Sequence, residues 1–434
     1  MLTGMPLTGM PLTGMPLTGM PLTGMPLTGM PLTGMPVGQW GASPLAPLVG
    51  AGLAALLTFG LCLGVMRVCQ RRGWLDRPEP RRVHGHPIPR LGGIAIFLSF
   101  TVVSLALFRP RSPHEWHVYV GLLAAAVVIV AVMAYDDVRG LPPLPRLGVQ
   151  TVAALIAIYP GAEGTLIQVI HNPLLASDHS RTFLALWIAI PFTWFWLTGM
   201  MNTVNWMDGT DGLAGGVVAI AACVMAAISW MLGQHGPALL CAILAGATLG
   251  FLPLNWHPAR LFMGDSGAMF LGLALAILAD VGGAKLATML LLLGVPILDV
   301  ARVILRRVRQ GRSPLRFDRA HLHHRLLAGG FSQRQIALLF YVITALFGGL
   351  TILAAYLQVH LAGWPLRIHL WPGLDIAASD LPTIVGLGLV GAITAGVLLL
   401  ALRRRAYLAA HRPWALPPSA SGSHPRLQAP AQRG

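Results

Sequence analysis

Charged residues are scarce in this sequence of 434 residues, and most of the charge is positive. Only 10% of the residues are Asp, Glu, Lys or Arg, whereas 55% are hydrophobic. A soluble chain of this length needs far more surface charge, so the composition excludes an ordinary soluble protein and predicts a polytopic membrane protein. Lysine is almost missing: Lys285 is the single one, and the net charge of +15 comes from arginine.

Cysteine is also rare, and the motif of P-loop ATPases is missing from the sequence. The four cysteines lie in or beside apolar runs without CxxC spacing, which favours buried thiols over a metal site or a disulfide. No GxxxxGK[ST] motif occurs, which argues against an ATP-driven P-loop machine. The arginines separate hydrophobic runs instead of forming one basic face, so we expect no nucleic-acid partner.

The first 36 residues are seven near-perfect copies of the unit MPLTG. Gly and Pro in every unit prevent a regular helix, and the unit is too short for a solenoid repeat. The segment has no basic start and no continuous apolar stretch, so it is not a signal peptide. We interpret residues 1–44 as a low-complexity tail, either disordered or the product of a start site placed too far upstream.

Apolar runs recur from residue 45 to residue 402. Because a membrane-spanning helix takes about 20 apolar residues, these runs predict an all-α membrane protein with about 11 spans. We place the spans at 45–66, 91–108, 117–134, 146–160, 182–200, 212–232, 236–253, 267–281, 285–305, 335–357 and 383–402. The expected domains are a transmembrane domain over 45–403 and a basic cytoplasmic tail over 404–434.

Arginine is concentrated in alternate loops, which predicts the orientation of the chain. Loop 67–90 holds seven arginines and loop 306–334 holds eight, whereas the loops between them in the alternation hold few. By the positive-inside rule the N-terminus lies outside and the C-terminus lies in the cytoplasm. The same alternation puts the segments 135–140, 201–211 and 262–267 on the cytoplasmic side.

Five of the 15 acidic residues lie in three short polar segments, YDDVRG (135–140), NTVNWMDGTDGLAGG (202–216) and FMGDSG (262–267). We expect these segments to form one site. The adjacent carboxylates of Asp136 and Asp137 repel each other at the end of an apolar span and need a compensating cation. That cation is either Mg²⁺, which binds carboxylates together with substrate phosphates, or Arg139 at a solvated helix end.

The other two segments also allow a structural interpretation. Asn205, Asp208 and Asp211 are three residues apart, as on one helix face, although the glycines around them favour a backbone close to a ligand. Asp211 could equally cap the next helix, and Asp265 could cap the span that follows it. Phe262 is either a core residue or a platform on which a base stacks.

The loop 306–334 carries a run of arginines followed by His321, His323 and His324. Guanidinium and imidazole groups bind phosphate oxygens. The alternatives are a zinc site and a patch that attracts anionic lipid. Acids suited to a hard metal, together with a loop suited to phosphate, predict phosphoryl transfer.

Six motifs, taken in this order, resemble the polyprenyl-phosphate N-acetylhexosamine-1-phosphate transferases, the family that includes MraY and the WecA/TagO enzymes. The motifs are RVHGHPIPRLGG (82–93), YDDVRGLPPLPRLGVQ (135–150), NTVNWMDGTDGLAGG (202–216), NWHPARLFMGDSG (255–267), PILDVARVILRR (296–307) and DRAHLHHRLL (318–327). The resemblance extends over residues 45–400. It implies transfer of a sugar-1-phosphate from a UDP-N-acetylhexosamine to undecaprenyl phosphate, with release of UMP.

The resemblance also implies a cofactor, a location and the site residues. The cofactor is Mg²⁺, with Mn²⁺ as the alternative, and the site faces the cytoplasm from a bacterial inner membrane, in a monomer or a homodimer. The implied metal ligands are Asp265 and Asn205, and the implied catalytic residues are Asp136, Asp137, Asp208 and Asp211. The implied substrate-binding residues are Arg82, His84, Asn202, Asn255, Phe262, His321, His323 and His324.

Within that set the resemblance implies more detailed roles. Asp136 or Asp137 would activate the lipid phosphate, Asp208 and Asp211 would help to bind the nucleotide, and Phe262 would lie under the uracil. The segment HLHHRLL resembles the WecA/TagO type more than MraY, which implies UDP-GlcNAc as donor and the start of a cell-envelope glycan such as O-antigen or teichoic acid. Arg82 and Arg146 stand where lysine is common, and Ala268 where serine is usual.

Three alternatives stay open at this point. One is the phospho-MurNAc-pentapeptide transferase of peptidoglycan synthesis, and another is an inactive scaffold of the same fold. The third is a membrane transporter, because intramembrane acids often mark ion pathways. The acids of this sequence cluster at one face and do not follow a path through the membrane, which favours the enzyme.

Overall fold

The structure of the chain, a computed structural model, describes residues 43–76, 87–159, 164–171, 181–281, 286–313, 318, 320–361, 367–371, 374–377 and 381–410. All of them belong to one unit of the chain, Gly41–Gly434. Nearly all of the predicted N-terminal tail, the predicted site residues Arg82 and His84, and most of the predicted basic tail lie outside the described residues.

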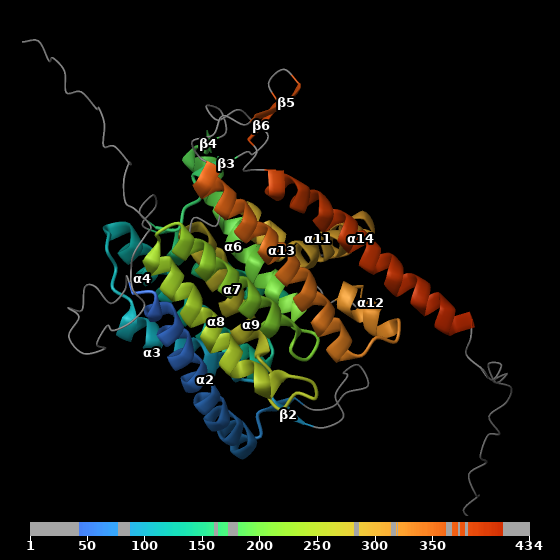
Figure 1. The fold of residues 1–434 in the computed structure, drawn as a ribbon. Coiled ribbons are helices and arrows are strands. Elements are labelled where there is room, and N and C mark those ends of the chain that lie inside the picture. The colour runs from blue at the N-terminus through green and yellow to red at the C-terminus, as the bar shows by residue number, and fades with distance from the viewer. Residues whose placement is uncertain are drawn as a thin grey trace, which may run out of the picture. The chain divides into compact units, whose positions relative to one another are not determined.

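Helices make up most of the described chain (Figure 1). They are α2 (Leu45–Arg72), α3 (Gly92–Leu107), α4 (Pro113–Arg139), α5 (Pro143–Ile158), α6 (Leu186–Met207), α7 (Leu213–Met231), α8 (His235–Asn255), α9 (Gly264–Val281), α10 (Leu286–Leu292), α11 (Gly294–Arg309), α12 (Leu322–Ala328), α13 (Gln333–Leu361) and α14 (Leu381–Ala410). Three antiparallel hairpins pair β1 (Leu75–Asp76) with β2 (Ile88–Pro89), β3 (Val169–His171) with β4 (Arg181–Phe183), and β5 (Arg367–Trp371) with β6 (Leu374–Ala377).

The helices have the length and composition of a multi-pass membrane protein. Among the described residues, six helices are long and apolar enough to cross a membrane, namely α2, α4, α7, α8, α13 and α14, and α3, α5 and α9 are shorter apolar helices. Large apolar side chains such as Leu48, Leu56 and Leu346 are 67–75% exposed, as expected of surfaces that contact lipid. The helical membrane-protein class is therefore confirmed, while the number of 11 spans and the orientation of the termini stay predictions.

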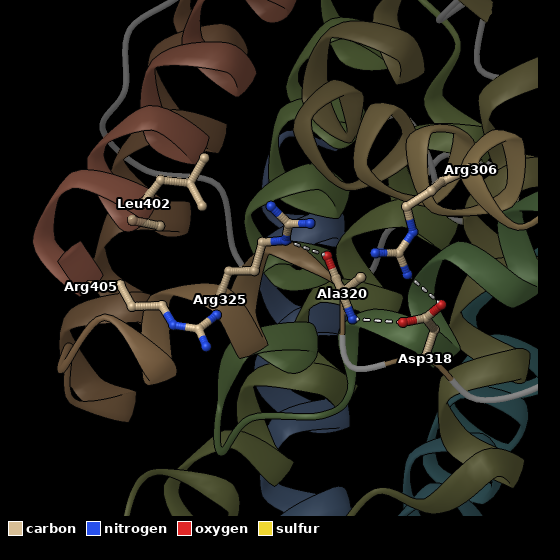
Figure 2. Close-up of a pocket in the computed structure, with 7 residues that line it drawn as sticks. Arg306, Asp318, Ala320, Arg325, Leu402 and Arg405 are labelled. Atoms are coloured by element: carbon tan, nitrogen blue, oxygen red, sulfur yellow. Dashed lines mark hydrogen bonds and ion pairs between the residues drawn. The ribbon is translucent and has the colours of Figure 1, made fainter. Parts of the chain in front are cut away.

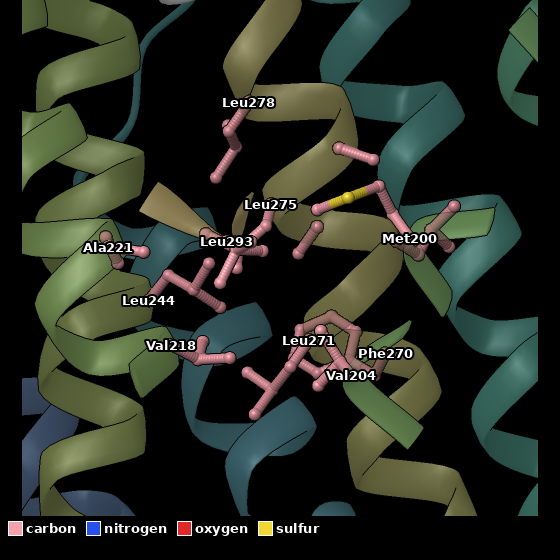
Figure 3. Close-up of a cluster of buried hydrophobic side chains, with 14 of the residues drawn as sticks. Met200, Val204, Val218, Ala221, Leu244, Phe270, Leu271, Leu275, Leu278 and Leu293 are labelled. Carbon is pink, nitrogen blue, oxygen red and sulfur yellow. The ribbon is translucent and has the colours of Figure 1, made fainter. Parts of the chain in front are cut away.

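The hydrophobic core lies where α6, α7, α8 and α9 pack together. Side chains of all four helices meet there, including Met200, Val218, Leu244 and Leu275 (Figure 3). In the most apolar part of each helix, 83% of the residues of α8 are buried but only 22% of those of α2 and 28% of those of α14. α8 is thus enclosed by its neighbours, as is the short helix α9, whose residues 268–279 are nearly all buried, and α2 and α14 lie at the periphery.

The predicted span 285–305 is broken in the structure. The chain forms α10 and α11 in its place, and the two helices meet at 85°. Pro296 explains the break, because its ring would collide with the carbonyl of Leu292 in a continuous helix and it has no N–H to donate. The bend also lets α11 approach α14 closely: a Cβ atom added to Gly294 would lie 2.5 Å from a methyl group of Val390.

Close packing between α3 and the start of α9 positions the segment FMGDSG. The backbone N–H groups of Gly92 and Gly93 donate to the carbonyls of Phe262 (2.9 Å) and Met263 (2.8 Å). A Cβ atom added to Gly93 would lie 2.1 Å from the backbone nitrogen of Gly267, so only glycine fits there. This contact fixes the N-terminus of α9, which carries Asp265, against the N-terminus of α3.

Candidate functional site

A cavity of about 400 Å³ lies among the ends of several helices and is lined by residues of two predicted polar segments, 202–216 and 262–267, and by the three histidines. The predicted site residues that line it are Asn202, Asn205, Asp208, Asp265, His321, His323 and His324. The remaining lining residues are Arg90, Leu141, Pro143, Arg146, Leu147, Gln150, Trp206, Gly209, Met269, Val303, Ile304 and Asp318. The cavity therefore combines carboxylates, amides, arginines and histidines, which is a lining suited to a charged, phosphate-bearing ligand.

Asp265 has three polar side-chain partners in this cavity. Arg146 Nη1 donates to Asp265 Oδ2 at 2.7 Å, and Asn205 Nδ2 donates to Asp265 Oδ1 at 3.0 Å. Arg90 Nη2 lies 3.6 Å from the same Oδ1. Asp265 stands in the first turn of α9, whose N-terminal dipole favours a negative charge. The two arginines and Asn205 hold this carboxylate at the edge of the cavity.

Asp136 lies behind the cavity and holds Arg146 in place. Its side chain is fully buried, and its Oδ2 lies 2.8 Å from Arg146 Nε. Arg146 Nη2 also donates to Asp136 Oδ1 at 3.1 Å, and the backbone N–H of Leu141 donates to that same oxygen. The contact forms because α4 ends at Gly140, whose φ is +75°, and the chain then turns into α5. Arg146 thus joins Asp136 to Asp265.

Asp137 caps the N-terminus of α9. Its Oδ1 accepts a hydrogen bond from the backbone N–H of Asp265 at 2.8 Å. Its Oδ2 accepts one from the backbone N–H (3.1 Å) and one from the hydroxyl (2.8 Å) of Ser266. Arg90 Nε lies 3.4 Å from Oδ1, so the buried charge is compensated. Asp137 therefore positions the helix that carries Asp265, and it does not itself line the cavity.

Asp208 faces the cavity and makes no side-chain hydrogen bond or ion pair with any residue that the structure describes. It follows the last residue of α6, Met207, so the chain turns at this point toward Gly212 and α7. Removal from water raises the pKa of Asp208 well above the ordinary value, and the charges of Asp265 and Asp137 raise it further against the opposing effect of Arg90. Asp208 is thus a carboxylate that can exchange a proton with a ligand.

The three histidines form one wall of the cavity. His321 Nδ1 lies 3.0 Å from Oδ2 of the buried Asp299. The rings of His321 and His323 are nearly parallel at 6.0 Å, and those of His323 and His324 are 4.2 Å apart. Burial, and then the neighbouring His324 and His321, lower the pKa of His323 to about 3, so its imidazole is neutral.

His323 also has an unused hydrogen-bonding atom. Its Nε2 is buried and has no partner among the described residues. A Cβ atom added to Gly209 would lie 2.6 Å from this nitrogen, so the glycine makes room for it. A buried polar atom without a partner is costly, and a ligand in the cavity would satisfy it.

Four predicted site residues contribute to the structure around the cavity. Asp211 Oδ2 lies 2.6 Å from His257 Nδ1 and accepts from Ala259 N at 3.2 Å. The side chain of Asn255 bridges the backbone of Gly212 and Leu261. Asn202 does line the cavity, where it exchanges hydrogen bonds with Gln150. Phe262 contributes its backbone to the contact with α3 and does not line the cavity. Their roles toward a substrate stay predictions.

Several residues of the site were not singled out as site residues from the sequence. They are Arg90, Arg146, Gln150, Trp206 and Asp299. A signal existed for two of them, because Arg146 and Gln150 are four residues apart and therefore share one face of α5. Arg146 was noted only as a departure from lysine. Arg90, Trp206 and Asp299 contact residues that are far away in the sequence, so the local spacing of residues does not assign them to the site.

Comparisons with known proteins support the interpretation of the six motifs. The model of glycosyl transferase family 4 matches residues 119–282. The chain is 32% identical over 307 residues to a probable undecaprenyl-phosphate N-acetylglucosaminyl 1-phosphate transferase of Bacillus subtilis, covering 69% of this chain and 83% of that protein. It is 34% identical over 334 residues to the decaprenyl-phosphate N-acetylglucosaminephosphotransferase of Mycobacterium tuberculosis, covering 69% and 80%.

A third relative is the undecaprenyl-phosphate alpha-N-acetylglucosaminyl 1-phosphate transferase of Escherichia coli, 28% identical over 307 residues, with 67% of this chain and 79% of that protein covered. These matches cover about two thirds of this chain and about four fifths of each relative. The resemblance inferred from the motifs is therefore confirmed. The chain belongs to the family of polyprenyl-phosphate N-acetylglucosamine-1-phosphate transferases.

Proposed function

We propose that this protein transfers N-acetylglucosamine-1-phosphate from UDP-GlcNAc to undecaprenyl phosphate and releases UMP. The names of the Bacillus subtilis, Mycobacterium tuberculosis and Escherichia coli relatives describe N-acetylglucosamine-1-phosphate transfer to polyprenyl phosphates. The product would be the first lipid-linked intermediate of a cell-envelope glycan. The arginine-rich loops support a site on the cytoplasmic face of the membrane, and the bacterial relatives support the inner membrane as its location.

The observation that carries the proposal is the set of contacts around Asp265. One carboxylate is held by a guanidinium (Arg146, 2.7 Å) and an amide (Asn205, 3.0 Å) at the edge of a cavity lined on another side by histidines. Phosphoryl transfer depends mainly on positioning and charge neutralisation, and it needs little covalent chemistry from the protein. Cationic and neutral donors around an acidic centre supply that environment.

A magnesium ion fits the donors of this cavity. Among the described residues no group of three His, Cys, Asp or Glu side chains is arranged to hold a metal by itself. Mg²⁺, however, commonly binds one or two carboxylates and completes its shell with substrate phosphates and water. Asp265 and the side-chain oxygen of Asn205 would provide such a partial shell. When bound, the metal would neutralise charge on the pyrophosphate.

The chain's own residues would then act on the two phosphates. An oxygen of the lipid phosphate attacks the phosphorus next to the sugar, the bond from that phosphorus to UMP breaks, and UMP leaves with the electron pair. Asp208, with its raised pKa, would accept a proton from the lipid phosphate. Arg146 and His323 would donate to phosphate oxygens, and Asp136 and Asp137 would position Arg146 and α9.

Replacing Asp265 with asparagine tests the proposed centre. Asp265→Asn keeps the shape of the side chain but removes the negative charge, so we expect UMP release to fall by a factor of about 100 or more. The matched control is Glu115→Gln, which makes the same kind of change in the first turn of α4, at a residue that does not line the cavity. Wild-type activity in a folded Asp265→Asn variant would remove this residue from the site.

A further inference from the structure

A second cavity, of about 430 Å³, lies where α11, α12 and α14 approach one another. The residues that line it are Arg306, Asp318, Ala320, Arg325, Ala401, Leu402 and Arg405. Figure 2 shows Arg405 extending from α14 toward Arg325 of α12, with Arg306 and Asp318 across the pocket. We call this cavity the arginine pocket. Of the described residues, Asp318 is the one that lines both the arginine pocket and the cavity that contains Asp265.

The single carboxylate of the arginine pocket is already neutralised. Asp318 Oδ2 accepts hydrogen bonds from Arg306 Nη2 (2.7 Å) and Arg307 Nη1 (2.8 Å), and its Oδ1 accepts one from the backbone N–H of Ala320 (2.9 Å). These contacts lower the pKa of Asp318 to about 2, although burial opposes them. The carboxylate therefore has no capacity left to balance the other arginines of the pocket.

Among the residues that the structure describes, Arg325 and Arg405 have no counter-ion. No carboxylate of the described chain lies within 4.0 Å of either guanidinium, and Arg325 donates only to the carbonyl of Ala320 (3.1 Å). Burial lowers the pKa of Arg325, and the positive charges of the neighbouring Arg302 and Arg306 lower it further. Arg306 Nε is buried and has no hydrogen-bond partner among the described residues. The pocket thus has several donors and an excess of positive charge.

The remaining wall of the pocket belongs to an apolar helix. Ala401 and Leu402 lie near the end of α14, a candidate membrane span, just before the run Arg403–Arg405. The exposed leucines Leu399 and Leu400 precede them on the same helix. Arginines at the end of a span lie at the level of lipid headgroups. The pocket therefore combines cationic donors with an apolar edge at the depth where a lipid carries its phosphate.

We propose that the arginine pocket binds a phosphate group and that an anionic membrane lipid supplies it. Guanidinium groups pair with phosphate oxygens through two parallel hydrogen bonds, and Arg325 and Arg405 have donors to spare for such pairing. The acyl chains would lie along Leu402 and the apolar face of α14. The proposal is independent of the reaction in the neighbouring cavity, because Arg325 and Arg405, on which it rests, do not line that cavity.

Binding of phosphatidylglycerol to the purified full-length protein tests the proposal. We expect native mass spectrometry to show phosphatidylglycerol bound in preference to phosphatidylcholine, which carries the same phosphate without net charge. Arg405→Gln should weaken phosphatidylglycerol binding about five- to tenfold, because one charge-assisted pair is lost. Arg405→Lys should give an intermediate affinity, because it keeps the charge but not the paired donors.

The matched control is Arg403→Gln, which removes the same charge two residues away on α14 outside the arginine pocket. We expect its affinity to stay within about twofold of wild type, and UMP release in phosphatidylcholine to be unchanged in both glutamine variants. Equal losses in Arg403→Gln and Arg405→Gln would mean a diffuse surface attraction and would overturn the pocket. Displacement of the lipid by inorganic phosphate alone would overturn the lipid as the source of the phosphate.

Discussion

Arg146 offers the sharpest test of how the site is held together. Its guanidinium contacts Asp136 through Nε (2.8 Å) and Nη2 (3.1 Å), and contacts Asp265 through Nη1 (2.7 Å). The side chain of Asp136 is fully buried, and that of Arg146 is 33% exposed. Arg146→Gln would leave a buried carboxylate without its cation and would release Asp265 from one of its two closest side-chain donors.

The size of the stability loss in Arg146→Gln follows from the burial of the ion pair between Asp136 and Arg146. Removing one partner of a fully buried ion pair costs about 3–5 kcal/mol, because the other charge stays buried and unpaired. Since Arg146 is one-third exposed, water can reach the pair, and we expect Arg146→Gln to lower the free energy of unfolding by about 1.5–3 kcal/mol. Arg146→Lys keeps the charge but loses the paired donors, and should lose about 1 kcal/mol or less.

A double-mutant cycle isolates this interaction. The free energy of unfolding would be measured in detergent for the wild type, Arg146→Gln, Asp136→Asn and the double variant. Because the double variant contains neither charge, it should be more stable than the sum of the single changes predicts, by about 1 kcal/mol or more. UMP release should fall about tenfold or more in Arg146→Gln and stay within a few-fold of wild type in Arg146→Lys.

Additive effects of the two single changes would refute this reasoning, because they would show that the contact between Asp136 and Arg146 contributes nothing to the folded state. Full activity in Arg146→Gln would refute the claim that Arg146 orients Asp265. The two readouts are separate, so a site that is stable but inactive can be told apart from one that has lost its local structure.

Three further predictions concern ionisation and topology. Because the pKa of Asp208 is raised, kcat/KM for UMP release should increase with pH above the ordinary carboxylate range, and Asp208→Asn should abolish this dependence along with most of the activity. Asp318, with a pKa of about 2, should stabilise the fold above about pH 4 by about 1–2 kcal/mol and lose this effect as the pH falls toward 2; Asp318→Asn should be less stable than the wild type above about pH 4, and the difference should shrink as the pH falls toward 2. A reporter fused after residue 410 should be cytoplasmic, and a periplasmic signal would contradict the predicted orientation.

The helices could be predicted from the sequence because each consists of a long apolar run between polar segments. Runs such as 45–66 and 335–357 are found within α2 and α13. The break between α10 and α11 was not predicted, because hydropathy averages over Pro296 and contains no information on the approach of Val390 to Gly294. An average over apolar residues identifies the segment but not its direction.

The parts of the candidate site that could be predicted from the sequence are those that lie in short polar motifs. The expectation that the three acidic segments form one site agrees with the direct contact between Asn205 and Asp265. The structure places Asp136 and Asp137 behind the cavity, because their partners Arg146 and the α9 backbone come from elsewhere in the fold. Spacing alone does not distinguish a carboxylate that faces a ligand from one that supports the residue facing it.

UMP release by the purified protein tests the central claim most directly. The protein would be supplied with UDP-GlcNAc, undecaprenyl phosphate and Mg²⁺, with EDTA and the Asp265→Asn variant as controls. The account predicts release that requires all three components and that disappears in both controls. No release with any UDP-N-acetylhexosamine, from a preparation that unfolds cooperatively, would contradict it.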